Sequence, residues 1–252
     1  MSQVEIKSRE EIALMREAGR IVADVLDALE QAVAPGITTW ELDALAEKMT
    51  AERGARPAFK GYLGFPCVLC ASINDEVVHG IPSRKRKLVE GDLMKLDFGV
   101  SYRGWFGDSA RTVPVGKVSL EARSLMETTR ESLQKGIQAM KPGNRLGDIG
   151  HAVQRHVEAR GFSVVRDFTG HGIGRKLHEH PHVPNYGQAG AGMKLRAGMV
   201  LAVEPMVNAG TSDIEILDDD WTAVTADRKL SAHFEHTILI TDGGPEVLTR
   251  GR

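Results

Sequence analysis

Two stretches of the chain repeat one another: PGITTWELDALAEKMTAERG at residues 35–54 and PGNRLGDIGHAVQRHVEARG at residues 142–161, an offset of 107 residues. Each begins with Pro-Gly, carries apolar residues at helical spacing and stops at Arg-Gly, which is typical of a helix C-terminus. In the first copy, Thr38 and Glu41 have the spacing of a capping box. A repeat of this kind predicts a chain built from two similar units.

The same offset extends the repeat in both directions. Upstream, residues 16–36 and 123–143 have helical periodicity, so each unit is expected to open with two helices. Downstream, EGDLMKLDFG (90–99) aligns with AGMVLAVEPM (197–206), and each is a glycine followed by an apolar strand. Helices followed by strand hairpins favour a mixed α/β (α+β) fold.

No linker, low-complexity run or change of composition separates the two units. The length of 252 residues suits one α/β unit better than two complete domains. We therefore expect a single domain over residues 1–252, made of two similar halves at about 8–115 and 116–252.

Each aligned strand ends in an acid, and Asp97 falls on Glu204. The segment after Asp97 predicts a hairpin that turns at Arg103-Gly104 and returns with Asp108. A two-residue turn there makes Asp97 and Asp108 diagonal neighbours on one face of the sheet. In the second half, the strand AHFEHTILIT (232–241) is expected to return with Glu235.

These acids are expected to hold metal ions. A carboxylate at the end of an apolar strand must be paired or bound to a cation if it is buried. The Gly-rich segment around His171 adds an imidazole, and oxygen ligands with one imidazole suit Mn, Fe, Co or Zn. Four acids are too many for one ion with an open position. Two ions that share carboxylates would use them all, and such a pair suits hydrolysis.

The composition of the chain limits which class of protein it can be and which partners it can have. Apolar residues make up 42% of the chain and charged residues 26%, as in globular proteins. The 32 Lys and Arg nearly balance the 34 Asp and Glu, so we expect no specific DNA partner and no membrane partner.

The N-terminal region has no signal-peptide pattern and no apolar run reaches membrane-spanning length. The two cysteines, Cys67 and Cys70, cannot form a disulfide framework, which favours a reducing, cytoplasmic location.

Six motifs follow in order along the chain: NDEVVHGIP with His79, LDFG with Asp97, GDSART with Asp108, TGHGIGRKLHEHP with His171 and His178, VEPM with Glu204, and FEHT with Glu235. Together they resemble the bacterial type I methionine aminopeptidases over nearly the whole chain. The resemblance implies the pita-bread fold, in which two pseudo-symmetric halves share a curved antiparallel sheet covered by helices. It also implies a cytoplasmic, monomeric enzyme that removes the N-terminal methionine of nascent proteins, preferring a small second residue.

The resemblance further implies how two ions are held. Asp108 and Glu235 would bridge them, Asp97 would complete one ion, and His171 and Glu204 would complete the other. The two divalent ions would be Co, Mn, Fe, Zn or Ni. A hydroxide bridging them would attack the scissile carbonyl.

The remaining roles also follow from the resemblance. Glu204 would accept a proton from the attacking water and pass it to the leaving amine. His178 would stabilise the developing oxyanion, and His79 would contact the substrate near the departing residue. The methionine pocket would be lined by Tyr62, Phe65, Cys70 and Trp221. At two positions beside this pocket, Leu177 and Phe59, the sequence departs from the commoner family pattern.

Two rival interpretations of the motifs predict sequence features that differ from those of this chain. A proline-specific peptidase of the same fold usually carries an additional N-terminal domain, which 252 residues cannot hold. A non-catalytic binding protein of the same fold would lose metal ligands, whereas all five are present here.

A basic run lies close behind His79. Arg84, Lys85, Arg86 and Lys87 are four consecutive cations in a chain of net charge −2. They are interpreted either as a solvated turn or as a contact with ribosomal RNA phosphate, which attracts local basic loops.

Overall fold

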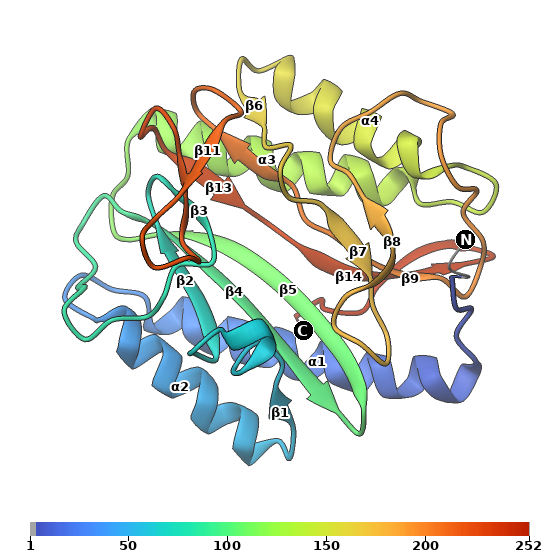
Figure 1. The fold of residues 1–252 in the computed structure, drawn as a ribbon, viewed down its shortest axis with the longest axis horizontal. Helices are drawn as coiled ribbons and strands as arrows, with labels where there is room; N and C mark the ends of the chain where they lie inside the picture. Colours follow the sequence, from blue (N-terminus) through green and yellow to red (C-terminus); the bar gives the residue numbers. More distant parts are fainter. Residues whose placement is uncertain (1–3, 252) are drawn as a thin grey trace.

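Four helices flank the sheets in the part of the chain that the computed structural model describes, residues 4–251. They are α1 (Arg9–Ala32), α2 (Thr39–Glu52), α3 (Leu120–Ala139) and α4 (Leu146–Glu158). In Figure 1, α1 and α2 lie beside the strands of the first half, and α3 and α4 beside those of the second. The predicted order of two helices at the start of each half is confirmed.

The repeat offset recurs in the helix bounds. The first helix of each pair ends at Ala32 and Ala139, and the second begins at Thr39 and Leu146. The predicted capping box of Thr38 is present, since its side chain accepts from the N–H of Glu41. The division into halves at about residue 115 stays a prediction, and this recurrence of 107 residues supports it.

The predicted ranges 16–36 and 123–143 begin too late and end too late. A second capping box, formed by Ser8 and Glu11, starts α1 at Arg9. At the other end, Pro35 follows two residues after Val33, which is already extended, and proline disfavours helical geometry in the residue before it.

All strand pairs in the described region are antiparallel. The first half is built on a long hairpin of β4 (Leu93–Tyr102) and β5 (Trp105–Pro114). Two short strands, β1 (Arg56–Pro57) and β2 (Leu69–Ile73), also pair with β4. Tyr102 pairs with Trp105, and both Arg103 and Gly104 have positive φ, so the predicted two-residue turn is confirmed.

The second half contains a five-stranded sheet in the order β15 (Gly244–Val247), β14 (His236–Thr241), β9 (Val200–Val203), β7 (Gly170–Gly172), β8 (Glu179–Val183). Two three-stranded sheets complete the fold. One has the order β13 (Ser231–His233), β10 (Met206–Asn208), β6 (Ser163–Val164), and the other β11 (Ile214–Ile216), β12 (Ala223–Thr225), β3 (Glu76–Val78). A short 3₁₀ helix, η1, spans Tyr62–Gly64.

The prediction of a continuous strand over residues 232–241 is wrong. The ladder is interrupted at Phe234-Glu235, between β13 and β14, and likewise at Glu204-Pro205, between β9 and β10. Pro205 has no N–H for a ladder bond, which explains one break. At both breaks the acid leaves the regular alternation of the strand.

The two halves are joined beside Asp108. The N–H of Asp108 donates to Thr237 Oγ1 at 3.1 Å, and the same hydroxyl donates to the Asp108 carbonyl at 2.8 Å. The N–H of Glu235 donates to the carbonyl of Ala110 at 2.9 Å. These bonds fix β5 of the first half against β14 of the second.

Helix α1 packs closely behind this junction. A Cβ on Gly107 would lie 3.0 Å from the backbone nitrogen of Gly19, so the glycine at position 107 permits a close approach of helix and strand next to Asp108. Apolar side chains of α1, β2 and β4 form the core of the first half, and those of α3, α4, β9 and β14 contribute to that of the second. None of the helices described between residues 4 and 251 could cross a membrane.

Candidate metal centre and active site

Five predicted metal ligands converge on one cavity of about 200 Å³. Asp97 comes from β4, Asp108 from β5 and His171 from β7, while Glu204 follows β9 and Glu235 precedes β14. Asp97 and Glu235 are 138 positions apart in the sequence, and the fold brings both to the lining of this cavity.

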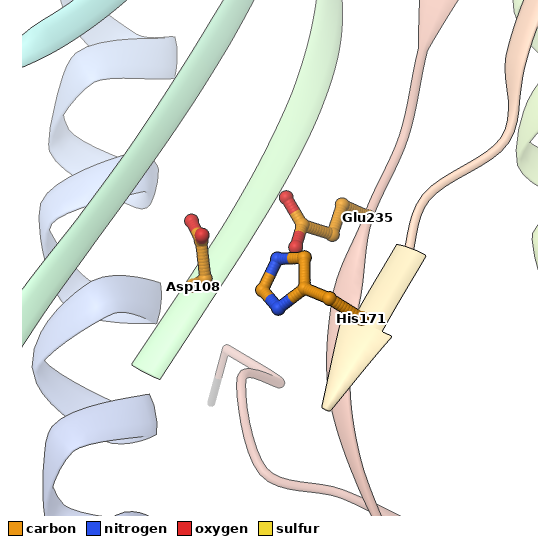
Figure 2. A group of neighbouring side chains, drawn as sticks. All are labelled: Asp108, His171 and Glu235. Atoms are coloured by element: carbon orange, nitrogen blue, oxygen red, sulfur yellow. The ribbon is translucent and has the colours of Figure 1, made fainter. Parts of the chain in front are cut away.

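Three of the five are close enough to share one ion. Asp108, His171 and Glu235 each offer a ligand atom, and these atoms lie within 4.8 Å of one another (Figure 2). Glu204 joins them, because its Oε1 lies 3.5 Å from His171 Nε2. Asp97 is the diagonal neighbour of Asp108, as the hairpin register predicted, since Gly99 stands opposite Asp108.

The tautomer of His171 is fixed by its backbone. Its Nδ1 lies 2.9 Å from the carbonyl oxygen of Gly172, which can only accept, so Nδ1 carries the proton. Nε2 is left with a lone pair that faces the carboxylates. Burial lowers the pKa of this imidazole to about 3, which keeps the lone pair free. This is the usual preparation of a histidine for metal ligation.

The four carboxyl groups are costly to bury without a cation. Burial raises the pKa of Asp108 to about 7. Burial also raises the pKa values of Asp97, Glu204 and Glu235 well above their ordinary range, and repulsion from neighbouring carboxylates raises these three further. Asp108 Oδ1 and Glu235 Oε1 are buried without a hydrogen-bond partner in the described chain. Divalent ions among these oxygens would remove both the repulsion and the unsatisfied acceptors, so the donor set fits the expected metals.

The two predicted substrate-contacting histidines lie on the same cavity. The ring centroid of His178 is 4.2 Å from that of His171, and its Nδ1 is 2.7 Å from the hydroxyl of Tyr62. His79 packs edge-on against Phe168 at 5.3 Å. It has a positive φ of 61°, an uncommon conformation for a residue other than glycine, at the exit of β3. Burial lowers the pKa of His79 to about 4, so it is neutral.

An apolar pocket adjoins the acids. The four predicted pocket residues all line the cavity: Tyr62, Phe65, Cys70 and Trp221. Phe59 and Leu177, the two residues that differ from the commoner family pattern, line it as well. Phe65 and Trp221 pack edge to face at 5.1 Å. Burial raises the pKa of the Cys70 thiol well above its ordinary value, so that residue offers a neutral, polarisable wall.

Sequence reasoning missed five residues of this wall: Leu63, Val78, Phe168, Thr169 and Met206. Three of them carried a usable signal, because Phe168 and Thr169 lie immediately before the Gly-rich segment of His171, and Met206 lies two residues after Glu204. Leu63, which is 81% exposed, carried none.

The similarity of this chain to known proteins agrees with the geometry of the site. Residues 13–242 match the sequence pattern of metallopeptidase family M24. The chain belongs to this family. It is 54% identical to the methionine aminopeptidase of Clostridium perfringens over 97% of this chain and 98% of that protein. It is 52% identical to methionine aminopeptidase 1 of Bacillus subtilis, with the same coverage.

A solved structure agrees over the full fold. The crystal structure of the methionine aminopeptidase of Thermotoga maritima superposes with a TM-score of 0.97 at 46% identity, covering 98% of this chain and all of that one. The M24 chain described here is therefore a metal-dependent hydrolase with the α/β (α+β) pita-bread fold, as the sequence predicted.

Proposed function

We propose that this M24 chain removes the N-terminal methionine of nascent proteins and peptides, with a preference for a small second residue. The observation that carries the proposal is the juxtaposition of a buried carboxylate-histidine cluster with an apolar, aromatic pocket in one cavity of about 200 Å³. Such a pocket suits an unbranched thioether side chain.

The cluster would hold two divalent ions, with Asp108 and Glu235 shared, Asp97 on one and His171 and Glu204 on the other. When bound, the ions supply Lewis-acid polarisation and a water that is acidic near neutral pH. Glu204 accepts a proton at Oε1, the oxygen that faces His171, and passes it to the leaving amine. His178 donates to the oxygen of the scissile carbonyl, and His79 contacts the substrate near the departing residue.

The proposal is tested with the purified, Mn-loaded protein and four kinds of peptide. Met-Ala-Ser should lose its methionine, Nα-acetyl-Met-Ala-Ser should not be cleaved, and a peptide with leucine in second place should react slowly. Cleavage of an Xaa-Pro dipeptide in preference to Met-Ala-Ser would support the proline-specific alternative instead.

His178→Ala is expected to lower kcat about 10²- to 10³-fold, the loss typical of one oxyanion donor, because the imidazole faces the cavity from beside His171. Metal content should stay at the parent's value, measured by elemental analysis, because His178 holds no ion. His156→Ala, on α4 beside Glu131, is the matched control and should leave kcat unchanged. Loss of metal from the His178 variant would contradict its assignment.

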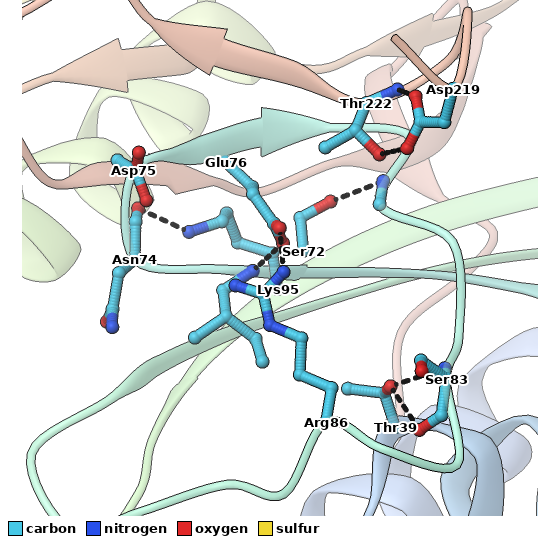
Figure 3. A network of polar contacts seen from close by, with 12 residues as sticks. Thr39, Ser72, Asn74, Asp75, Glu76, Ser83, Arg86, Lys95, Asp219 and Thr222 are labelled. Atoms are coloured by element: carbon cyan, nitrogen blue, oxygen red, sulfur yellow. Dashed lines mark hydrogen bonds and ion pairs between the residues drawn. The ribbon is translucent and has the colours of Figure 1, made fainter. Parts of the chain in front are cut away.

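The basic run offers a second contact, with the ribosome, and we propose it for three of the four predicted residues. Arg86 is engaged internally, since its guanidinium pairs with the buried carboxylate of Glu76 (Figure 3). Arg84 stacks over the Trp40 ring at 4.4 Å, which presents its charge on the surface, and Lys85 and Lys87 are exposed. These three cations could meet RNA phosphate without breaking a buried pair.

Changing Arg84, Lys85 and Lys87 together to Ala is expected to weaken co-sedimentation with ribosomes and to flatten its salt dependence, because phosphate contacts release counterions. Turnover of free Met-Ala-Ser should stay within about twofold, since local surface charge adds little to the binding of a short peptide.

The charge-matched control changes three exposed lysines far from this loop in sequence, Lys117, Lys141 and Lys194, to Ala. Equal co-sedimentation of the two triple variants would return the basic run to the solvated-turn interpretation. A monomeric state and a cytoplasmic location stay predictions, and the free, buried thiols of Cys67 and Cys70 support the second.

A further inference from the structure

His233 is a buried histidine that the proposed mechanism does not use. It ends β13, is 1% exposed, and does not line the catalytic cavity. Neither of its ring nitrogens has a hydrogen-bond partner in the described part of the chain. Leaving a buried polar group unpaired costs about 1–3 kcal/mol, so an apolar side chain of similar size would stabilise this core better.

The backbone around this histidine is held from both sides. Its N–H donates to Thr112 Oγ1 at 2.9 Å, and that hydroxyl donates back to the His233 carbonyl at 2.7 Å. Two residues earlier, the carbonyl of Ser231 accepts from the buried ammonium of Lys95 at 2.9 Å, and the same ammonium donates to Asn74. Strand β13 is therefore fixed against β4 and β5, while the imidazole is left without a partner.

The free ring points at Glu204. His233 Nε2 lies 4.0 Å from Glu204 Oε2, and His171 Nε2 lies 3.5 Å from the other oxygen, Oε1. Each oxygen of this carboxylate thus faces one histidine. The gap to His233 is about 1 Å longer than a hydrogen bond, which a small side-chain rotation covers.

We propose that His233 is a positioning residue for Glu204. Its Nε2–H donates to Oε2 and fixes the rotation of the carboxylate, so that Oε1 stays directed at His171 and the cavity. The role is indirect, since His233 does not line the catalytic cavity. It rests on the function proposed above, in which Glu204 accepts the proton.

The test compares two variants with the parent. His233→Leu fills a similar volume without a donor, and His233→Gln keeps an N–H at similar reach. We expect the Leu variant to lower kcat about 10- to 100-fold with KM unchanged, and to weaken metal binding to the apo-protein about tenfold in calorimetry, as loss of a hydrogen bond to a ligand does. The Gln variant should stay within about threefold of the parent in both measurements.

A stability measurement separates this role from core packing. The metal-free Leu variant should melt about 2–4 °C higher than the parent, because the buried Nδ1 of the imidazole, which has no hydrogen-bond partner, has been removed. A gain in stability together with a loss of turnover is not expected of a residue that only fills space.

Three results would overturn the proposal: parental kcat and metal affinity in the Leu variant, equal losses in the Gln and Leu variants, or a His233 ring protonated at Nδ1. The last is read from ¹⁵N spectra of the parent protein, so it decides the matter even if a variant fails to fold. Absence of Met-Ala-Ser cleavage by the parent would instead contradict the proposed function.

Discussion

Removal of divalent ions will abolish cleavage of Met-Ala-Ser, lowering kcat/KM by at least about 10⁴-fold, because an uncoordinated water has a pKa far above that of a metal-bound one. The buried, unpartnered oxygens of Asp108 and Glu235 are the structural reason to expect this dependence. The measurement is a peptide assay after dialysis against a chelator, with metal content determined in the same samples. Mn, Fe or Co should restore the activity.

Two controls accompany the chelation experiment. Circular dichroism of the metal-free protein should show the helices intact, which separates loss of ions from loss of fold. Addition of Mg should restore little activity, because an imidazole ligand favours softer ions. Turnover above a tenth of the parental value in protein verified to be metal-free would contradict the expectation.

Glu204→Gln is expected to lower kcat about 10³-fold, within the range attributed to one acid-base group. The amide has the size of the carboxylate but cannot take a proton from water. The assay should show this loss with metal content reduced by no more than one ion per chain, since three carboxyl groups and His171 remain.

The matched control for this substitution is Glu215→Gln. Glu215 lies on β11, is exposed and pairs with Arg228, so its loss should leave kcat within about twofold. Equal rates for the parent and the Glu204 variant at saturating metal would remove Glu204 from the reaction.

Helices and the acid-bearing hairpin were predictable because local chemistry determines them. Thr38 and Glu41 mark a helix start by themselves, and Arg103-Gly104 sets the register that brings Asp97 beside Asp108. The cavity was predicted through motifs rather than through physics alone. The repeat alone was enough to align Asp97 with Glu204. The prediction that Trp221 lines the cavity came from the resemblance to a known family.

The features that were missed depend on distant partners. The breaks at Glu204 and Glu235 arise where two strands leave their ladders, and in the sequence apolar residues stand on both sides of each acid without marking a break. Arg86 reads as one of four equal cations until Glu76, ten residues earlier, is seen to lie beside it. The sequence places His233 two residues before Glu235 and on the same face, but its lack of a hydrogen-bond partner and its approach to Glu204 become visible only in the fold.

The bonds between Asp108 and Thr237, and between Ala110 and Glu235, have a consequence for how the protein folds. The hairpin of β4 and β5 is local in the sequence, and by itself it places two acids side by side with no counter-ion. The complete ligand set exists only after residue 235 has docked, so ion capture comes last and locks the two halves together. Unfolding temperature should therefore rise with free metal concentration, and a chain that ends before Glu235 should bind ions more weakly than the full chain, because it lacks one of the two shared carboxylates.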